Sequence, residues 1–78
     1  MGLVMQITVK LFANFRDGRF VSADREYPSG TRIADVVREL KIAEAEIGII
    51  IVDNRHAEIE YTFSGGENLA LFPLLGGG

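Results

Sequence analysis

A single amphipathic helical stripe is the feature that most constrains how this chain can fold. Four apolar residues follow the i, i+3, i+4, i+7 spacing of one helix face: Ile33, Val36, Val37 and Leu40. Thr31 is a residue type preferred at the N-cap, so a helix of about three turns is predicted after it. The stripe needs an apolar partner surface, and the strand-like segments around it are the available source.

Strand patterns lie on both sides of this helix. They are predicted at residues 6–12, 20–27, 48–52, 58–61 and 69–72. The first alternates apolar and polar residues, as a half-buried strand does. The run 48–52 is nearly all Ile and Val, which is typical of an interior strand covered on much of both faces. Pro73 limits ladder pairing beyond the last strand.

The order strand, strand, helix, strand, short strand, strand predicts an α+β architecture. One main helix would pack on one face of a mixed sheet of four to five strands. A chain of 78 residues is long enough for one domain only. We expect that domain to span residues 1–75, with residues 76–78 as a flexible C-terminal tail.

Composition excludes several classes of function. The formal net charge of −3 argues against a nucleic-acid partner, which needs clustered Lys and Arg. The absence of cysteine and the single histidine, His56, exclude thiol nucleophiles, disulfides, multi-histidine zinc sites and histidine-based triads. The chain has no apolar run long enough for a bilayer and no signal-peptide pattern. A cytoplasmic protein that binds neither metal nor membrane is therefore expected.

Few residues suggest catalysis. Glu58 and Glu60 would share one strand face, but a solvated face is the favoured interpretation because a glycosidase-like pair needs a cleft. Gly65 and Gly66 precede a strand, which favours a turn over a phosphate-binding loop in front of a helix. His56 lies beside a predicted turn and is interpreted as a surface histidine.

The C-terminal glycines are the most unusual feature. Gly76, Gly77 and Gly78 offer no core packing and carry maximal chain entropy. One interpretation is a frayed terminus, which composition alone slightly favours. The other is a tail that threads a narrow channel and presents the Gly78 α-carboxylate as a reactive group. The preceding Leu74 and Leu75 would either cover the sheet edge or dock in a partner's groove.

Three stretches together resemble one family. They are residues 10–16, residues 64–73 and the ending Phe72-Pro73-Leu74-Leu75-Gly76-Gly77-Gly78. They resemble the small subunit of molybdopterin synthase, within the MoaD/ThiS family of ubiquitin-like sulfur carrier proteins. The resemblance covers nearly the whole chain and implies a β-grasp fold. This chain departs from the family at residues 53–55, where Asn-Gly-Arg is common, and at Leu74, where a second proline is common.

The resemblance implies a carrier rather than an enzyme. An adenylating enzyme of the ubiquitin-activating type would bind the sheet face and use ATP to convert the Gly78 carboxylate into an acyl-adenylate. A sulfur donor would then displace AMP and leave a thiocarboxylate, with no cofactor bound to the carrier itself. The tail would next enter the large synthase subunit, and sulfur would pass to a pterin precursor of the molybdenum or tungsten cofactor. The residues implied to contact these partners are Phe72, Pro73, Leu74, Leu75, Gly76 and Gly77.

Other functions stay open beside this one. A carrier for thiamine thiazole, tRNA thiolation or cysteine synthesis would use the same chemistry. A ubiquitin-like modifier would instead join Gly78 to lysines through isopeptide bonds. A plain β-grasp interaction domain with a frayed tail would need neither Gly77 nor Gly78.

Overall fold

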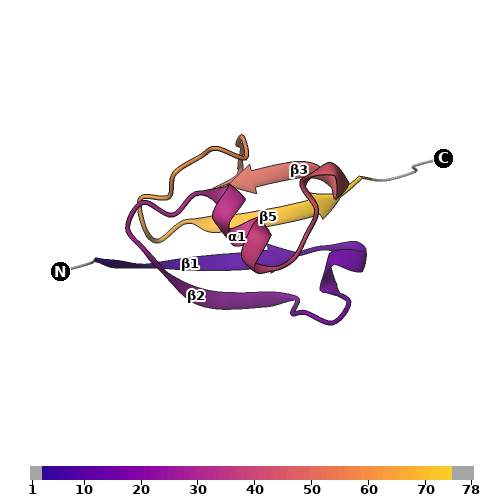
Figure 1. Cartoon of the computed structure of the whole chain (residues 1–78), viewed down its shortest axis with the longest axis horizontal. Helices are drawn as coiled ribbons and strands as arrows, with labels where there is room; N and C mark the ends of the chain where they lie inside the picture. The colour runs from indigo at the N-terminus through magenta and orange to yellow at the C-terminus, as the bar shows by residue number, and fades with distance from the viewer. Residues whose placement is uncertain (1–2, 75–78) are drawn as a thin grey trace.

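The computed structural model describes residues 3–74, in which one α-helix packs on one face of a mixed five-stranded sheet (Figure 1). The strands are β1 (Val4–Leu11), β2 (Ser22–Pro28), β3 (Ile47–Val52), β4 (Arg55–His56) and β5 (Asn68–Pro73). Helix α1 (Ile33–Glu39) and the 3₁₀ helices η1 (Ala13–Arg16) and η2 (Glu44–Glu46) complete the elements. The predicted α+β architecture is confirmed.

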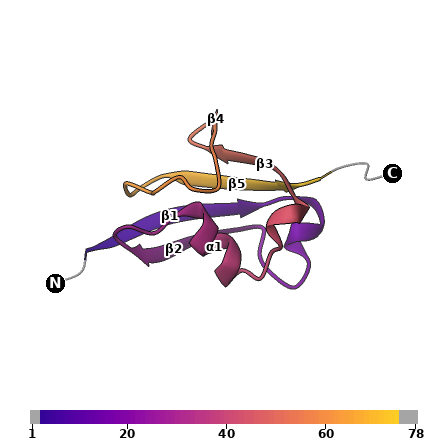
Figure 2. The same ribbon diagram turned by 45° about the horizontal axis from the view of Figure 1, so that its top comes forward.

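The strand order is β2-β1-β5-β3-β4. The central strands β1 and β5 run parallel, and every other neighbouring pair is antiparallel. Helix α1 therefore lies between two hairpin-like halves in sequence and crosses one face of the sheet that they form (Figures 1 and 2). This is the β-grasp order. Because β5 lies beside β1 in the centre of the sheet, Leu74 directly follows a central strand.

The core lies between α1 and the alternate positions of the two central strands. Its fully buried side chains are Ile7, Val9, Leu11, Ile33, Val36, Val37, Leu69 and Leu71. Burying one such side chain contributes roughly 1.5–3 kcal/mol, so this two-layer contact is the main source of stability. No helix in residues 3–74 is long and apolar enough to cross a membrane.

The helix begins later than predicted. Its N-cap is Arg32, not Thr31, and α1 is a seven-residue helix rather than one of three turns. Asp35 accepts a hydrogen bond from the Arg32 backbone N–H at 2.9 Å. The Thr31 hydroxyl instead donates to the Pro28 carbonyl at 2.7 Å. The first helical turn is thus capped by an acidic side chain from inside the helix, and Thr31 belongs to the preceding turn.

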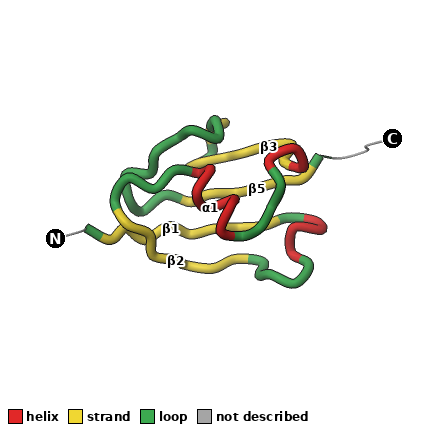
Figure 3. The backbone as a smooth tube through the Cα atoms, viewed as in Figure 1, coloured by secondary structure: helices red, strands yellow, loops and turns green. Residues whose placement is uncertain are grey.

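The fourth strand also differs from the prediction. Residues 58–61 form no strand, and pairing occurs at Arg55–His56 instead. Asp53 and Asn54 both have positive φ, 50° and 69°, as in a two-residue hairpin turn, so pairing resumes at Arg55. The segment after β4 then leaves the sheet (Figure 3). The carbonyls of Tyr61 and Ile59 accept hydrogen bonds from the N–H groups of Ile33 and Ala34, so they face the start of α1 and not a neighbouring strand.

Strand β3 is less covered than its composition predicted. Val52 is buried, but Ile49 is 43% exposed and Ile50 and Ile51 are half-buried. The physical reason is that α1 covers only one face of the sheet, and the two-residue β4 pairs only with the end of β3. The β-branched run therefore lies partly at an open face and a partly unpaired edge.

Candidate functional site

The sheet face opposite α1 carries apolar side chains of β3 and β5 that are partly exposed. On β5, Ala70 and Phe72 alternate with buried core residues, so they point to the open side. Ile51 is paired with Ala70, and Ile49 with Phe72, and cross-strand partners share a face. These four residues form what we term the open apolar face. An exposed apolar surface of this kind is typical of an interaction site.

An aromatic stack borders this face. The rings of Phe12 and Phe72 have centroids 4.2 Å apart and planes only 11° from parallel. The Arg16 guanidinium lies 5.3 Å from the Phe12 ring centroid, and its Nε donates to the Leu11 carbonyl at 2.7 Å. Stacked pairs contribute about 0.5–1.5 kcal/mol beyond burial. The stack thus holds Phe72 in place as a rigid element beside the start of the tail.

A shallow hollow lies on the same side of the molecule. It is lined by Lys10, Phe12, Ile51, Asn54, Asn68, Leu69, Ala70 and Phe72. Toward β2 the face becomes acidic, because Asp24 and Glu26 occupy the positions opposite Thr8 and Gln6. Asp24 accepts a hydrogen bond from the Thr8 hydroxyl at 2.7 Å. The face is therefore apolar and basic near β5 and acidic near β2. A partner of complementary charge could bind it in one orientation only.

The last described residues, Phe72 to Leu74, lie beside this face. Of the residues expected to contact partners, Phe72 is half-buried on the open side, Pro73 is buried and Leu74 is 62% exposed. Phe72 therefore lies on the face of the sheet away from the core. The Leu74 N–H donates to the Glu46 carbonyl at 2.9 Å, so the backbone is held up to this point. Leu75, Gly76, Gly77 and Gly78 lie outside the described residues, as does the expected domain end at residue 75.

A buried carboxylate that the sequence analysis did not single out sets the start of β5. Glu67 is only 5% exposed and accepts hydrogen bonds from Gly65 N–H (2.6 Å), Ser64 N–H (2.8 Å) and the Tyr61 hydroxyl (2.7 Å). Burial alone would raise the pKa of Glu67, but these hydrogen bonds outweigh it and lower the pKa below its ordinary value. The predicted turn at residues 65–66 is confirmed, and both glycines have positive φ. The sequence signal that could have indicated this role is a glutamate directly after the turn residues Ser-Gly-Gly.

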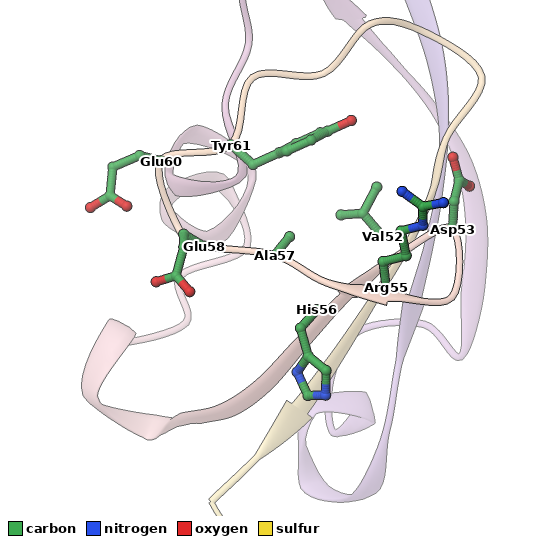
Figure 4. Close-up of a pocket in the computed structure, with 8 residues that line it drawn as sticks. All are labelled: Val52, Asp53, Arg55, His56, Ala57, Glu58, Glu60 and Tyr61. Atoms are coloured by element: carbon green, nitrogen blue, oxygen red, sulfur yellow. The ribbon is translucent and has the colours of Figure 1, made fainter.

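A second hollow lies between the β3–β4 hairpin and the segment after it (Figure 4). Tyr61 points toward Val52 and Arg55, whereas Glu58 and Glu60 extend away from that side. Residues 3–74 contain no group of three or more His, Asp or Glu side chains placed to hold a metal ion. The two glutamates are exposed, which agrees with a solvated face rather than an acid/base pair.

These features define a class by fold: a small ubiquitin-like β-grasp protein with an open apolar face and a C-terminal Gly-Gly-Gly sequence. No protein-family model matches the chain, and no curated protein matches it. Solved structures do share its fold. One is described as molybdopterin converting factor, subunit 1, from Pyrococcus furiosus: TM-score 0.73, 24% identity, covering 91% of this chain and 99% of that one.

Two structures from Haloferax volcanii are also similar. A protein solved in solution has a TM-score of 0.77 at 19% identity, covering 96% of this chain and 88% of its own. Small archaeal modifier protein 1 has a TM-score of 0.72 at 17% identity, covering 91% of this chain and 99% of that one. The fold is thus that of MoaD-like and small modifier proteins, as the sequence predicted.

Proposed function

We propose that this protein is a cytoplasmic sulfur carrier whose C-terminal Gly78 is adenylated and converted to a thiocarboxylate, for synthesis of the molybdenum or tungsten cofactor. The observation that carries the proposal is a juxtaposition. A partly exposed apolar face on a β-grasp fold lies beside an exposed Leu74, from which the chain continues to Gly76-Gly77-Gly78. The fold shared with a protein described as molybdopterin converting factor, subunit 1, supports the choice of pathway.

The chemistry explains why the carrier needs a partner enzyme. A carboxylate is a poor electrophile, because its negative charge repels nucleophiles and oxide is a poor leaving group. The Gly78 carboxylate oxygen would attack the α-phosphorus of ATP and release pyrophosphate. Hydrosulfide supplied by the donor would then attack the carbonyl carbon of the mixed anhydride, expel AMP and leave the thiocarboxylate, with loss of its proton to solvent. ATP binds to the adenylating enzyme, and the carrier supplies only its terminal carboxylate.

The geometry suggests how such an enzyme recognises the carrier. The open apolar face, which includes Phe72 and Ile49, would dock on an apolar surface of the enzyme. The basic side chains Lys10 and Arg16 and the acidic β2 side would fix the orientation, since charge complementarity sets register and association rate. Leu74 would then lead the tail into the catalytic channel. After sulfuration the same face would bind the large synthase subunit, where Gly78 would deliver its sulfur.

The experiment is the intact mass of the protein after incubation with an adenylating enzyme, ATP and a sulfur donor. We expect the mass increase of one oxygen replaced by sulfur, and its absence in a variant lacking Gly77 and Gly78. The same enzyme with a second carrier that it is shown to thiolate is the control for activity. An unchanged mass beside a thiolated control refutes the carrier function for that partner set. Reduction-resistant conjugates on lysines, without a thiocarboxylate, would identify a modifier instead.

A further inference from the structure

We propose that Gly48 is a positioning residue that sets the direction in which the C-terminal tail leaves the sheet. The inference rests on the proposed function, because direction matters only if Gly78 must reach a partner's active site. The backbone concerned is that of Gly48 and Leu74, which lies directly beside the Ile49–Phe72 pair.

The strand pairing is irregular at this residue. Ile47 pairs with Pro73 and Ile49 pairs with Phe72, so Gly48 is an extra residue of β3 with no partner on β5. An extra residue of this kind is a β-bulge, which bends its strand and changes the direction of the neighbouring backbone. Beyond the bulge, Leu74 N–H donates to the Glu46 carbonyl at 2.9 Å. The end of β5 is thus fastened to the start of β3 on both sides of Gly48.

The approach of the two backbones leaves no room for a side chain. A Cβ atom added to Gly48 would lie 2.9 Å from the Pro73 carbonyl oxygen and 3.1 Å from both the N and Cα of Leu74. All three atoms belong to the backbone, so rotating a side chain cannot relieve the contact. Gly48 does not have positive φ, so its conformation is not what requires glycine. Close approach is the remaining reason.

The composition of β3 makes the glycine informative. Ile47, Ile49, Ile50 and Ile51 surround it. Glycine within a strand weakens it, because it packs nothing and loses more entropy on ordering. The close approach of the Pro73 and Leu74 backbone explains why Gly48 interrupts an otherwise β-branched strand.

The short reach of the tail makes its direction matter. Residues 75–78 follow Leu74, and four residues span at most roughly 14 Å at about 3.3–3.6 Å each. Once the open apolar face is docked, this length leaves little slack for Gly78 to meet a fixed nucleotide. A misplacement of about 1 Å at a reacting centre can lower a rate about a hundredfold. A shift of Leu74 would therefore change catalysis by the partner more than it changes the fold.

The test compares Gly48→Ala with Gly30→Ala. Gly30 has positive φ and lies in the turn after β2, at the opposite end of the sheet from Leu74, so Gly30→Ala introduces backbone strain without touching the exit. We expect Gly48→Ala to lower kcat/KM for adenylation at least about tenfold, and Gly30→Ala to leave it within about twofold. Equal values for Gly48→Ala and the wild type, with both folded by circular dichroism, overturn the proposal.

A second measurement needs no partner and separates this inference from the proposed function. The amide of Leu74 in the free wild-type protein should be protected from hydrogen exchange, and Gly48→Ala should accelerate its exchange at least about tenfold relative to the Leu71 amide. An unprotected Leu74 amide in the wild type overturns the positioning role even if Gly48→Ala does not fold. If the exchange result holds but the wild type is not adenylated, the proposed function fails and the structural role of Gly48 stands.

Discussion

Replacing Glu67 by glutamine tests whether this buried carboxylate organises the start of β5. Its two oxygens accept from three donors, with Gly65 N–H on one and Ser64 N–H and the Tyr61 hydroxyl on the other. Glutamine keeps one acceptor oxygen and places an NH₂ group against a donor. At least one short hydrogen bond is lost, and the rest lose their charge assistance.

The loss in the free energy of unfolding expected for Glu67→Gln follows from these hydrogen bonds. A hydrogen bond to a charged group contributes about 1.5–3 kcal/mol net, and bonds within one network are not additive. Glu67→Gln should therefore lower the free energy of unfolding by about 2–4 kcal/mol, a large share of the roughly 5–15 kcal/mol typical of a domain. Urea unfolding at pH 7 measures this change as a shift in midpoint at constant slope.

The pH dependence supplies a second readout. The folded pKa of Glu67 lies below its ordinary value of 4.5. The ionised form is therefore the stabilising one: its contribution is present above pH 4.5 and is lost as the pH falls toward the folded pKa. The wild type should lose stability through this window, and Glu67→Gln should lose less. The exposed Glu60 gives the control, because Glu60→Gln should change stability by at most about 0.5 kcal/mol. Equal stability and equal acid slopes for Glu67→Gln and wild type would refute the reasoning.

Three further outcomes are expected. Phe72→Ala removes the ring stacked on Phe12 and should raise the KM for adenylation about tenfold or more, since aromatic residues dominate interfaces; an unchanged KM would place docking elsewhere. One residue added after Gly78 should abolish AMP transfer, so that the protein acquires no label from ATP radiolabelled in its AMP part. A labelled protein would contradict the mechanism. Arg19→Ala removes hydrogen bonds to the carbonyls of Leu40 (2.8 Å), Phe15 (3.1 Å) and Lys41 (3.2 Å), and should lower the free energy of unfolding in urea by about 1–2 kcal/mol without changing KM.

Features that depend on neighbours within one element were predictable. Of the predicted stripe, Ile33, Val36 and Val37 are buried as expected, and Leu40, at the C-cap of α1, is half-buried. In β1 the predicted alternation is confirmed, with Ile7, Val9 and Leu11 inward. The turn at Gly65 was also predictable, because positive φ favours glycine there. The fold class could be inferred from the order of these elements.

Features that depend on distant partners were not. The fourth strand was displaced because carbonyls of the segment before Thr62 bind the N–H groups of α1, a contact that no local pattern encodes. The exposure of Ile49 depends on which face α1 covers. In the sequence, Glu67 cannot be distinguished from a surface carboxylate. Only the fold shows that the Tyr61 hydroxyl donates a hydrogen bond to it.

The candidate site divides along the same line. Apart from the fourth strand, the sequence by itself determined the elements of the fold, and it contains the Gly76-Gly77-Gly78 segment on which the proposed chemistry depends. Periodicity and residue type act within a few neighbouring positions. The tertiary structure alone decided that Phe72 turns away from the core, that it stacks on Phe12, and that Gly48 lies against Pro73 and Leu74. Those contacts join residues up to sixty positions apart, and their geometry is set by strand register and a bulge, which only the packed sheet specifies.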